Sequence, residues 1–431
     1  MSLVEKLVDR WKNIESPFLI HPDGSFFFDD ILKQERLDLS QVKSGDVVAL
    51  IGDYDPLTLS IFFRLIELNV IIVPLTKETL SDHNYFFETA GVQIVIEGKD
   101  IKKRPNSEQN ALIESLRKKE CPGLIAFSSG TTGRPKAILH DFSLFLKRFE
   151  TPRPTLRTVN FLMFDHVGGL NTLFHTLFNG GVIIVPEKRS VESILIACEK
   201  HQAEVLPTTP TFLRMMLMSG LIPDRLSKSI KIISYGSERM DQNTLDEFCK
   251  LLPNVDFRQT FGTSELGVVR VKSKARDSLF MKIGDIGVET KVEKNILHLR
   301  SSNRMIGYLN APSPFDPDGW YNTNDVIQEK DGFYKVVGRI GDVINVGGLK
   351  FMGSEVERVA LDYEGITFVK AYAVPNPITG HHVELKIEPA NEKKFNLSAY
   401  KKYMKSALPS HMMPKKFVVA NIEIGNRFKK L

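Results

Sequence analysis

Residues Phe127–Lys136 read Phe-Ser-Ser-Gly-Thr-Thr-Gly-Arg-Pro-Lys, at the end of the apolar run Gly123–Phe127. Positions 128–136 carry four hydroxyl side chains, two glycines and one lysine. A loop of this composition turns tightly, offers many N–H and O–H donors and brings a cation to an anion, so it predicts a polyphosphate site. The order Gly130-x-x-Gly133-x-x-Lys136 is not that of a Walker A loop, which needs Gly-x-x-x-x-Gly-Lys-Ser/Thr.

Apolar runs on both sides of this loop predict an α/β fold. Val47–Ile51 reads as a buried strand, Pro56–Leu68 as a helix and Val70–Leu75 as a second strand, which together form a βαβ unit. Further strands are expected at Val92–Ile96, Thr158–Phe164, Gly181–Val185 and Ile230–Ser234, and further helices at Leu80–Ala90, Leu170–Phe178 and Val191–His201. Alternation of this kind predicts mostly parallel sheets covered by helices.

The pattern changes after Glu265. Short alternating runs at Ile296–Arg300 and Phe333–Val337 predict a small antiparallel β unit. From Gly338 onward, helices are expected near Ser354–Leu361 and Ser398–Leu408, and strands near Ile366–Val374 and His382–Ile387. The chain is therefore expected to form a large N-terminal α/β domain of mostly parallel helix-covered sheets plus a small β unit (1–337). A small α+β C-terminal lid domain (338–431) is expected to follow it.

Composition narrows the class of protein. The 431 residues are 42% hydrophobic and 25% charged, as in soluble globular proteins, and leave room for two or three domains. A net charge of +5 is mild over this length and does not indicate a nucleic-acid partner. Cys121, Cys198 and Cys249 match neither a metal site nor a redox pair, which favours free thiols in a reducing compartment.

No membrane segment is expected. The chain has no window of about 18 uninterrupted apolar residues, which a spanning helix would need. The amphipathic start, Met1–Arg10, lacks the long apolar core of a signal peptide. A cytoplasmic location is therefore expected.

The stretch Ser128–Lys136 resembles the phosphate-binding signature of the AMP-forming acyl-adenylating superfamily. That superfamily contains acyl- and aryl-CoA synthetases, the adenylation domains of peptide synthetases, and luciferases. Further matches follow in the family's order from about residue 45 to the C-terminus, nearest to the acyl- or aryl-CoA ligase branch. The resemblance implies that the ATP phosphates are bound by Ser128, Ser129, Gly130, Thr131, Thr132, Gly133 and Lys136.

Two later segments resemble the family's adenine site. Gly236-Ser-Glu-Arg-Met240 is similar to its Gly-Gly-Glu-Pro-Leu loop, which implies that Gly236, Ser237 and Glu238 cradle the adenine. Gln259–Gly267 resembles the Tyr-Gly-x-Thr-Glu motif, with Phe261 in place of the tyrosine. The resemblance implies that Phe261 stacks on adenine beside Gly262, that Ser264 and Glu265 face the phosphates, and that Glu265 holds Mg²⁺.

The ribose site and the hinge are implied by two more matches. Gly319–Asp325 resembles Gly-Trp-Tyr-x-Thr-Gly-Asp, so Asp325 would accept hydrogen bonds from the ribose, with Asn324 in place of glycine. Gly338–Glu357 resembles the domain-joining segment, which implies that Arg339 touches the ribose and that residues 339–342 form the hinge. Gly341 stands at the hinge position, and Gly347-Gly348 would let a pantetheine arm pass.

The catalytic residues are implied by weaker matches. Ile422–Leu431 is similar to the family's Ile-Pro-x-Thr-x-x-Gly-Lys stretch, which places the catalytic lysine at Lys429, with Phe428 in place of glycine and Lys430 as the alternative. Asp165–Gly169 resembles a CoA-ligase segment in which the histidine, here His166, borders the acyl pocket. Met215, Met216 and Met218 pack in the core or line an acyl tunnel.

The implied activity is ATP-dependent conversion of a carboxylic acid to acyl-AMP with release of pyrophosphate, with Glu265, His166 and Lys429 as catalytic residues. The acyl group then passes to a thiol, on CoA or on the pantetheine of an acyl carrier protein. A small or aromatic acid is favoured over a long chain. An amino-acid-adenylating domain, with Asp165 pairing the substrate ammonium, and a nucleotide-binding protein that has lost catalysis remain open. The sequence does not indicate which acid, which thiol or which oligomeric state applies.

Overall fold

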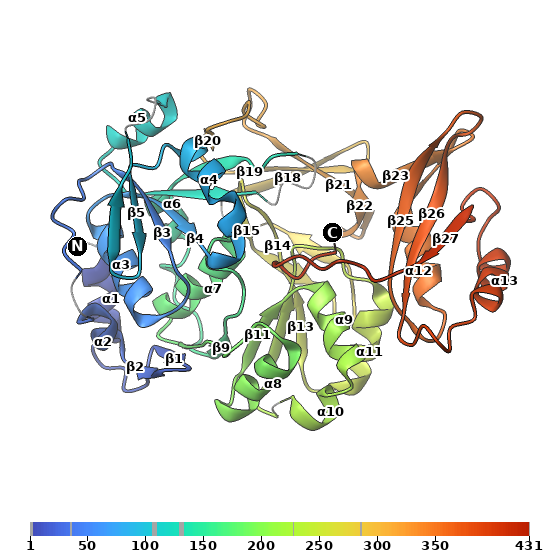
Figure 1. Cartoon of the computed structure of the whole chain (residues 1–431), viewed down its shortest axis with the longest axis horizontal. Coiled ribbons are helices and arrows are strands. Elements are labelled where there is room, and N and C mark those ends of the chain that lie inside the picture. The colour runs from blue at the N-terminus through green and yellow to red at the C-terminus, as the bar shows by residue number, and fades with distance from the viewer. Residues whose placement is uncertain are drawn as a thin grey trace.

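The computed structural model describes residues 3–34, 37–105, 110–128, 133–226, 228–284 and 287–430. These residues form two seven-stranded sheets, a six-stranded sheet, a five-stranded sheet and a two-stranded ribbon, with helices packed against the sheets (Figure 1). The predicted α/β class, with mostly parallel large sheets, a separate β unit and an α+β C-terminal unit, is confirmed. In the described part of the chain, no helix combines the length and the apolar character needed to cross a membrane.

The first large sheet has the strand order β20-β8-β7-β4-β3-β5-β6. Its centre is parallel, whereas β6, β8 and β20 pair antiparallel at the two sides. The strands are β3 (Val47–Ile51), β4 (Ile71–Leu75), β5 (Ile94–Glu97), β6 (Asp100–Lys103), β7 (Gly123–Phe127), β8 (Ala137–Asp141) and β20 (Gly307–Tyr308). The accompanying helices are α3 (Pro56–Glu67), η1 (Lys77–Asp82), α4 (His83–Ala90), α5 (Ala111–Arg117) and α6 (Phe142–Lys147).

The second large sheet has the order β13-β12-β11-β9-β10-β1-β2 and is parallel except for the β1–β2 pair. The strands are β1 (Leu19–His21), β2 (Gly24–Phe26), β9 (Arg157–Val159), β10 (Val182–Ile184), β11 (Val205–Thr208), β12 (Ile232–Tyr235) and β13 (Asp256–Gln259). The helices are α1 (Leu3–Trp11), α2 (Phe28–Leu32), α7 (Val167–Phe178), α8 (Val191–Lys200), α9 (Pro210–Ser219), α10 (Ile222–Arg225) and α11 (Gln242–Leu251).

The predicted strand over Thr158–Phe164 was wrong beyond Val159. The chain makes one last backbone bond to the sheet, from Asn160 N to Ile184 O at 2.9 Å, and then turns away toward α7. Phe161 and Phe164 are both buried, but in different hydrophobic clusters. Their apolar character led to the prediction of a buried strand. In the structure, these residues belong to a loop that packs between two hydrophobic cores.

The predicted β unit is an antiparallel sheet in the order β16-β17-β22-β21-β19-β18, preceded by the ribbon β14–β15. Its strands are β16 (Val271–Ser273), β17 (Met281–Ile283), β18 (Val288–Glu293), β19 (Ile296–Ser301), β21 (Tyr321–Lys330) and β22 (Phe333–Arg339). The ribbon pairs β14 (Phe261–Thr263) with β15 (Gly267–Val269). The sheet carries two of the implied nucleotide motifs, at β21 and at the end of β22, and the ribbon carries part of a third. Both lie near the two large sheets (Figure 1).

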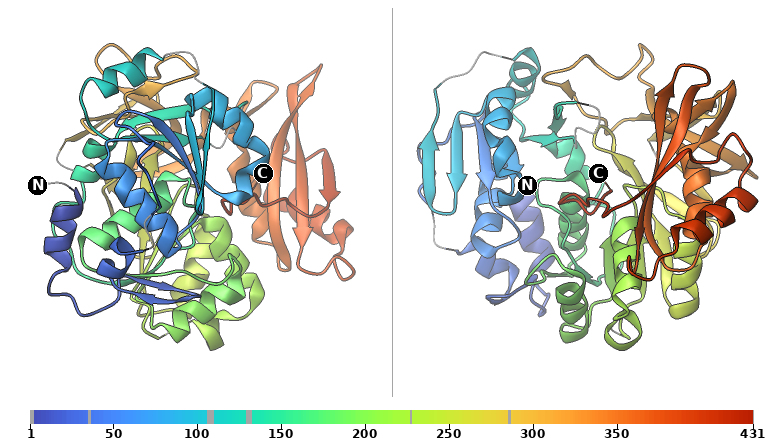
Figure 2. Two further views of the ribbon diagram at one scale, coloured as in Figure 1. Left: turned by 60° about the vertical axis from the view of Figure 1, so that its left-hand side comes forward. Right: turned by 45° about the vertical axis from the view of Figure 1, so that its right-hand side comes forward.

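The C-terminal unit has a hydrophobic core of its own, built from Ile344, Phe351, Val356, Val369, Leu385, Tyr400 and their neighbours. Its elements are η2 (Ile340–Asp342), β23 (Val343–Val346), β24 (Leu349–Met352), α12 (Gly353–Leu361), β25 (Ile366–Asn376), β26 (Gly380–Pro389), α13 (Leu397–Ala407) and β27 (Lys416–Val419). After β27 the chain leaves this unit and returns to the middle of the molecule, as all three views show (Figures 1 and 2). The boundary at 337/338 and the hinge at 339–342 stay predictions.

Candidate functional site

A cavity of about 1780 Å³ lies where the large sheets, the antiparallel sheet and the C-terminal segment meet. Every predicted site residue that the structure describes lines it. These residues are Ser128, Gly133, Lys136, His166, Gly236, Ser237, Glu238, Phe261, Gly262, Ser264, Glu265, Asp325, Arg339 and Lys429. Ser129, Gly130, Thr131 and Thr132 lie outside the described residues.

The two ends of the signature loop are held together between β7 and β8. Ser128 N donates to Lys136 O at 3.0 Å, and Lys136 N donates to Ser128 Oγ at 2.9 Å. The Lys136 ammonium lies 4.8 Å from the centre of the Tyr308 ring, within the range of a cation–π contact. This lysine is thereby held at the cavity wall, where it can meet a phosphate.

The glycines of the implied adenine site are required by close backbone approaches. A Cβ on Gly236 would lie 2.7 Å from the backbone oxygen of Thr260, and one on Gly262 would lie 2.5 Å from Gly267 O. Sequence reasoning attributed Gly236 to contact with a flat ligand, whereas the structure shows that it also lets β12 and β13 end side by side. Glu238 accepts from Thr211 N at 3.2 Å and from Lys430 N at 3.3 Å, so it also ties α9 to the C-terminal segment.

Glu265 is buried between two tyrosines. Its Oε1 accepts a 2.6 Å hydrogen bond from Tyr308 Oη, and Tyr321 donates to the same carboxylate. Burial first, and then the Glu265 charge, raise the pKa of both phenols, so they remain protonated donors. No group of three or more His, Cys, Asp or Glu side chains in the described residues could hold a metal. A Mg²⁺ ion at Glu265 would therefore take its remaining ligands from phosphate and water.

The implied ribose residues form a partly buried ion pair. Arg339 Nε donates to Asp325 Oδ1 at 3.2 Å, and the Asp325 side chain is only 8% exposed. Burial raises the pKa of Asp325, and Arg339 opposes that shift. Asn324 has φ +59°, so it adopts the left-handed turn for which the family's pattern uses glycine. Gly341 does not need its glycine freedom here, since a Cβ would enter open space and φ is not positive.

The side chains of Lys429 and Lys430 have different surroundings. Lys429 lines the cavity, whereas Lys430 Nζ lies 3.8 Å from Glu357 Oε2 and donates to Val369 O at 3.2 Å. The pKa of Lys429 is lowered to about 8, chiefly by burial; Glu238 opposes the shift, and Arg427 and Arg339 add to it. The position that faces the nucleotide-site residues is therefore Lys429.

We call residues 425–430 the C-terminal strap. Phe428 sits in the strap at φ +52°, and its ring packs edge-on against Phe161 and Phe212 at centroid distances of 5.5 and 4.9 Å. Thr209 Oγ1 donates to Phe428 O at 2.8 Å. Sequence reasoning saw Phe428 only as a departure from glycine. The structure shows that it keeps the left-handed turn and anchors the strap.

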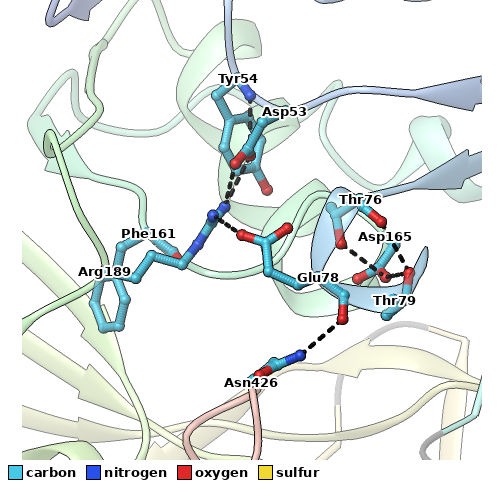
Figure 3. Close-up of polar contacts among 9 residues, drawn as sticks. All are labelled: Asp53, Tyr54, Thr76, Glu78, Thr79, Phe161, Asp165, Arg189 and Asn426. Atoms are coloured by element: carbon cyan, nitrogen blue, oxygen red, sulfur yellow. Dashed lines mark hydrogen bonds and ion pairs between the residues drawn. The ribbon is translucent and has the colours of Figure 1, made fainter. Parts of the chain in front are cut away.

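A second contact of the strap reaches a polar cluster that sequence reasoning missed (Figure 3). Asn426 Nδ2 donates to Glu78 O at 2.9 Å. Arg189 forms ion pairs with Glu78 at 2.9 Å and with Asp53 at 2.6 Å, and its Nε donates to Phe161 O at 2.8 Å. Arg189 thus joins the loops after β3 and β9 to the helix η1 after β4, and so links the two large sheets beside the strap. These charges lie far apart in the sequence and match no motif.

Asp165 does not line the cavity. Its Oδ2 accepts from Thr76 and Thr79, each at 3.4 Å, and the residue is 4% exposed and absent from the cavity wall (Figure 3). His166 beside it does line the cavity, and its Nδ1 accepts from Gly168 N at 3.2 Å at the start of α7. Burial, Arg427 and Lys429 lower the pKa of His166, so the imidazole is neutral. A substrate ammonium in this cavity would not reach Asp165 as it stands.

Two of the three methionines of α9 follow the core interpretation, and Met218 follows neither alternative. Met216 is fully buried, Met215 packs against the same hydrophobic cluster, and Met218 is 46% exposed. None of the three lines the cavity.

Comparison with known proteins gives the same picture. The family described as AMP-binding enzyme matches residues 35–295. A 2-succinylbenzoate–CoA ligase of Bacillus licheniformis is 24% identical, over 89% of this chain and 87% of the relative. The medium/long-chain-fatty-acid–[acyl-carrier-protein] ligase FadD10 of Mycobacterium tuberculosis is 24% identical, over 63% of this chain and 57% of the relative. The anthranilate CoA ligase AuaEII, solved with anthranoyl-AMP, superposes with a TM-score of 0.82 at 15% identity, covering 100% of this chain and 95% of that one.

Proposed function

Because the chain belongs to the AMP-binding enzyme family, we propose that it activates a small carboxylic acid as acyl-AMP and passes the acyl group to a thiol. One relative acts with CoA, another with an acyl carrier protein, and a similar structure holds an aryl-AMP, which supports both steps. The proposal places the reaction in the cytoplasm, in keeping with three free cysteines. The observation that carries it is the shared cavity of Ser128, Lys136, Glu265, Asp325 and Lys429.

The first half-reaction needs charge neutralisation rather than a base. A carboxylate is already an anion near neutral pH, so its obstacle is the approach to a negatively charged α-phosphate. We assign Lys429 and Lys136 to neutralise and align the phosphates, and Asp325 with Arg339 to hold the ribose. Mg²⁺ at Glu265 would add positive charge at the phosphates when bound.

The second half-reaction is assigned to a movement of the C-terminal unit. Rotation of residues 338–431 about 339–342 would withdraw Lys429 and open a path for a thiol. Gly347 and Gly348, with φ of +61° and +88°, form the two-residue turn between β23 and β24, and a Cβ on either would meet no atom within 4 Å. Such a bare turn suits the edge along which a pantetheine arm would pass.

The proposed function is tested by incubating the purified protein with ATP, Mg²⁺, hydroxylamine and a panel of aliphatic and aromatic carboxylic acids. We expect AMP to accumulate with at least one acid, and the matching acyl hydroxamate to appear by mass spectrometry. Hydroxylamine traps acyl-AMP directly, so the experiment does not require the right thiol. Absence of AMP with every acid would reject the proposal.

The lowered pKa of Lys429 predicts a pH signature. The ammonium is charged below about pH 8 and neutral above it, so kcat/KM for ATP in adenylation should fall about tenfold per pH unit on the alkaline side. Bound phosphates raise a lysine pKa, so the fall in kcat should begin at higher pH. In Lys429→Arg the guanidinium stays charged, and the alkaline limb of kcat/KM should vanish. An unchanged limb in that variant would assign the titration to another group.

A further inference from the structure

The cavity extends past the nucleotide-site residues into a region that we call the inner chamber, lined from residues 144–181 and 267–271. Between 144 and 181 its titratable side chains are Lys147, Arg148, Arg153, His166 and His175, and none is a carboxylate. The carboxylates of the described cavity wall come from elsewhere, namely Glu238, Glu265, Asp325 and Asp342. The inner chamber is therefore electropositive.

Arg148 is the central feature of this chamber. Its guanidinium lies over the Phe145 ring at 4.7 Å and against Gly267, where a Cβ would come within 2.2 Å of Nη1. Among the residues that the structure describes, Nη1 alone finds a hydrogen-bond partner, Val268 O at 3.3 Å, while Nε and Nη2 are buried without one. Burial lowers the pKa of Arg148 to about 10, with no carboxylate from the described part of the chain opposing the shift, so the guanidinium stays charged near neutral pH. A buried cation without a counter-ion is costly, and an anionic ligand would relieve that cost.

The face of α7 that lines the chamber is polar as well. Asn171, Thr172, His175 and Asn179 recur on one side of the helix at helical spacing. Burial and Arg153 lower the pKa of His175 to about 4, so its neutral ring offers one donor and one acceptor. Thr172 and Asn179 bond within the protein, to Gly168 O and to Arg153 N and His175 O. Asn171 and His175 are therefore the side chains of this wall that can meet a polar end group of the substrate.

We propose that the acid activated here carries a second anionic group, with a dicarboxylic acid as the simplest case. The distal carboxylate binds at Arg148, supported by the α7 face around His175, while the reacting carboxylate lies near His166 and Lys429. A guanidinium matches a carboxylate in charge and shape, and burial of Nε and Nη2 of Arg148 keeps water from competing for these two donors. This inference rests on the proposed function and specifies its substrate class.

The test compares acids that differ only in the distal group: benzoate with terephthalate, hexanoate with adipate, and decanoate with sebacate. Pyrophosphate release gives kcat/KM for each. In at least one pair we expect the dicarboxylate to be favoured by about tenfold or more, equal to about 1.4 kcal/mol. If monocarboxylates react and no dicarboxylate is favoured, this inference fails and the proposed function stands. If no acid releases pyrophosphate, both fail.

Variants of Arg148 test the residue itself. In Arg148→Gln the preference should disappear through a loss of about tenfold on the dicarboxylate alone, mainly in KM, and Arg148→Lys should keep part of it. Arg10→Gln on the exposed surface of α1 is the matched control and should change neither acid. An equal loss on both members of the pair in Arg148→Gln would mark a structural role. The wild-type comparison remains decisive if Arg148→Gln does not fold.

Discussion

Lys429→Ala should slow acyl-adenylate formation by about 10²–10³-fold, because it removes from the cavity wall the cation that we assign to the phosphates. The loss should be confined to the first half-reaction. Substrate-dependent exchange of labelled pyrophosphate into ATP should collapse, while thioester formation from supplied acyl-AMP should remain near the wild-type rate. A loss in one half-reaction alone is informative because a general folding defect would lower both.

The adjacent lysine provides the control. Lys430 has the same charge and chain length, but its ammonium is engaged with Glu357 and Val369 O on the C-terminal unit. Lys430→Ala should therefore change pyrophosphate exchange by much less than Lys429→Ala does. Equal loss of exchange in the two variants, or equal loss of both half-reactions in Lys429→Ala, would contradict the assignment of Lys429.

The fold could be predicted where local pattern and tertiary environment agree. β7 occupies Gly123–Phe127 as expected, because five consecutive buried residues suit a central strand covered on both faces. The prediction failed at Thr158–Phe164, where the same apolar signal serves a loop between two cores. Periodicity reports that a side chain is buried but not which core receives it.

Contacts within the site could be predicted where short motifs supply the residues that make them. The motifs placed Asp325 and Arg339 together although 14 positions separate them, and the structure joins them at 3.2 Å. Contacts made by single charges from distant loops carry no such signal. Arg189 meets Asp53 and Glu78 only because the loop after β3 and the helix η1 converge on it, and the guanidinium of Arg148 fits only against the bare Cα of Gly267.

Departures from a motif were hardest to interpret from sequence. Asn324 and Phe428 both replace glycine, and both keep a positive φ, of 59° and 52°. Asparagine tolerates this conformation at little cost, whereas for a bulky aromatic residue it is a strained outlier. Phenylalanine at 428 therefore requires a compensating gain, and the two edge-on ring contacts in the structure supply one.

The variants Phe428→Ala and Phe428→Gly separate the cost of the left-handed backbone at position 428 from the stabilisation by the two ring contacts. The left-handed backbone costs about 1–2 kcal/mol in a residue with a side chain, and each ring contact contributes about 0.5–1.5 kcal/mol. Alanine loses the contacts and keeps the strain, so docking of the strap should weaken by about 10–100-fold. Glycine loses the contacts but relieves the strain, so its loss should be smaller. The adenylation rate in a single turnover should therefore fall in the order wild type, Phe428→Gly, Phe428→Ala.

The thioester step should show the opposite tendency. If rotation of the C-terminal unit precedes thiol attack, a weaker anchor favours the rotated state, so transfer from supplied acyl-AMP should be unchanged or faster in both variants. Phe26→Ala at the edge strand β2 removes a partly buried phenylalanine far from the strap and should leave the ratio of the two half-reactions unchanged. Should the alanine variant adenylate as fast as the glycine variant, the strain at Phe428 would have no part in docking. A parallel fall in both half-reactions would instead mean that Phe428 serves only the stability of the large domain, since anchoring of the strap concerns the step in which Lys429 meets the phosphates.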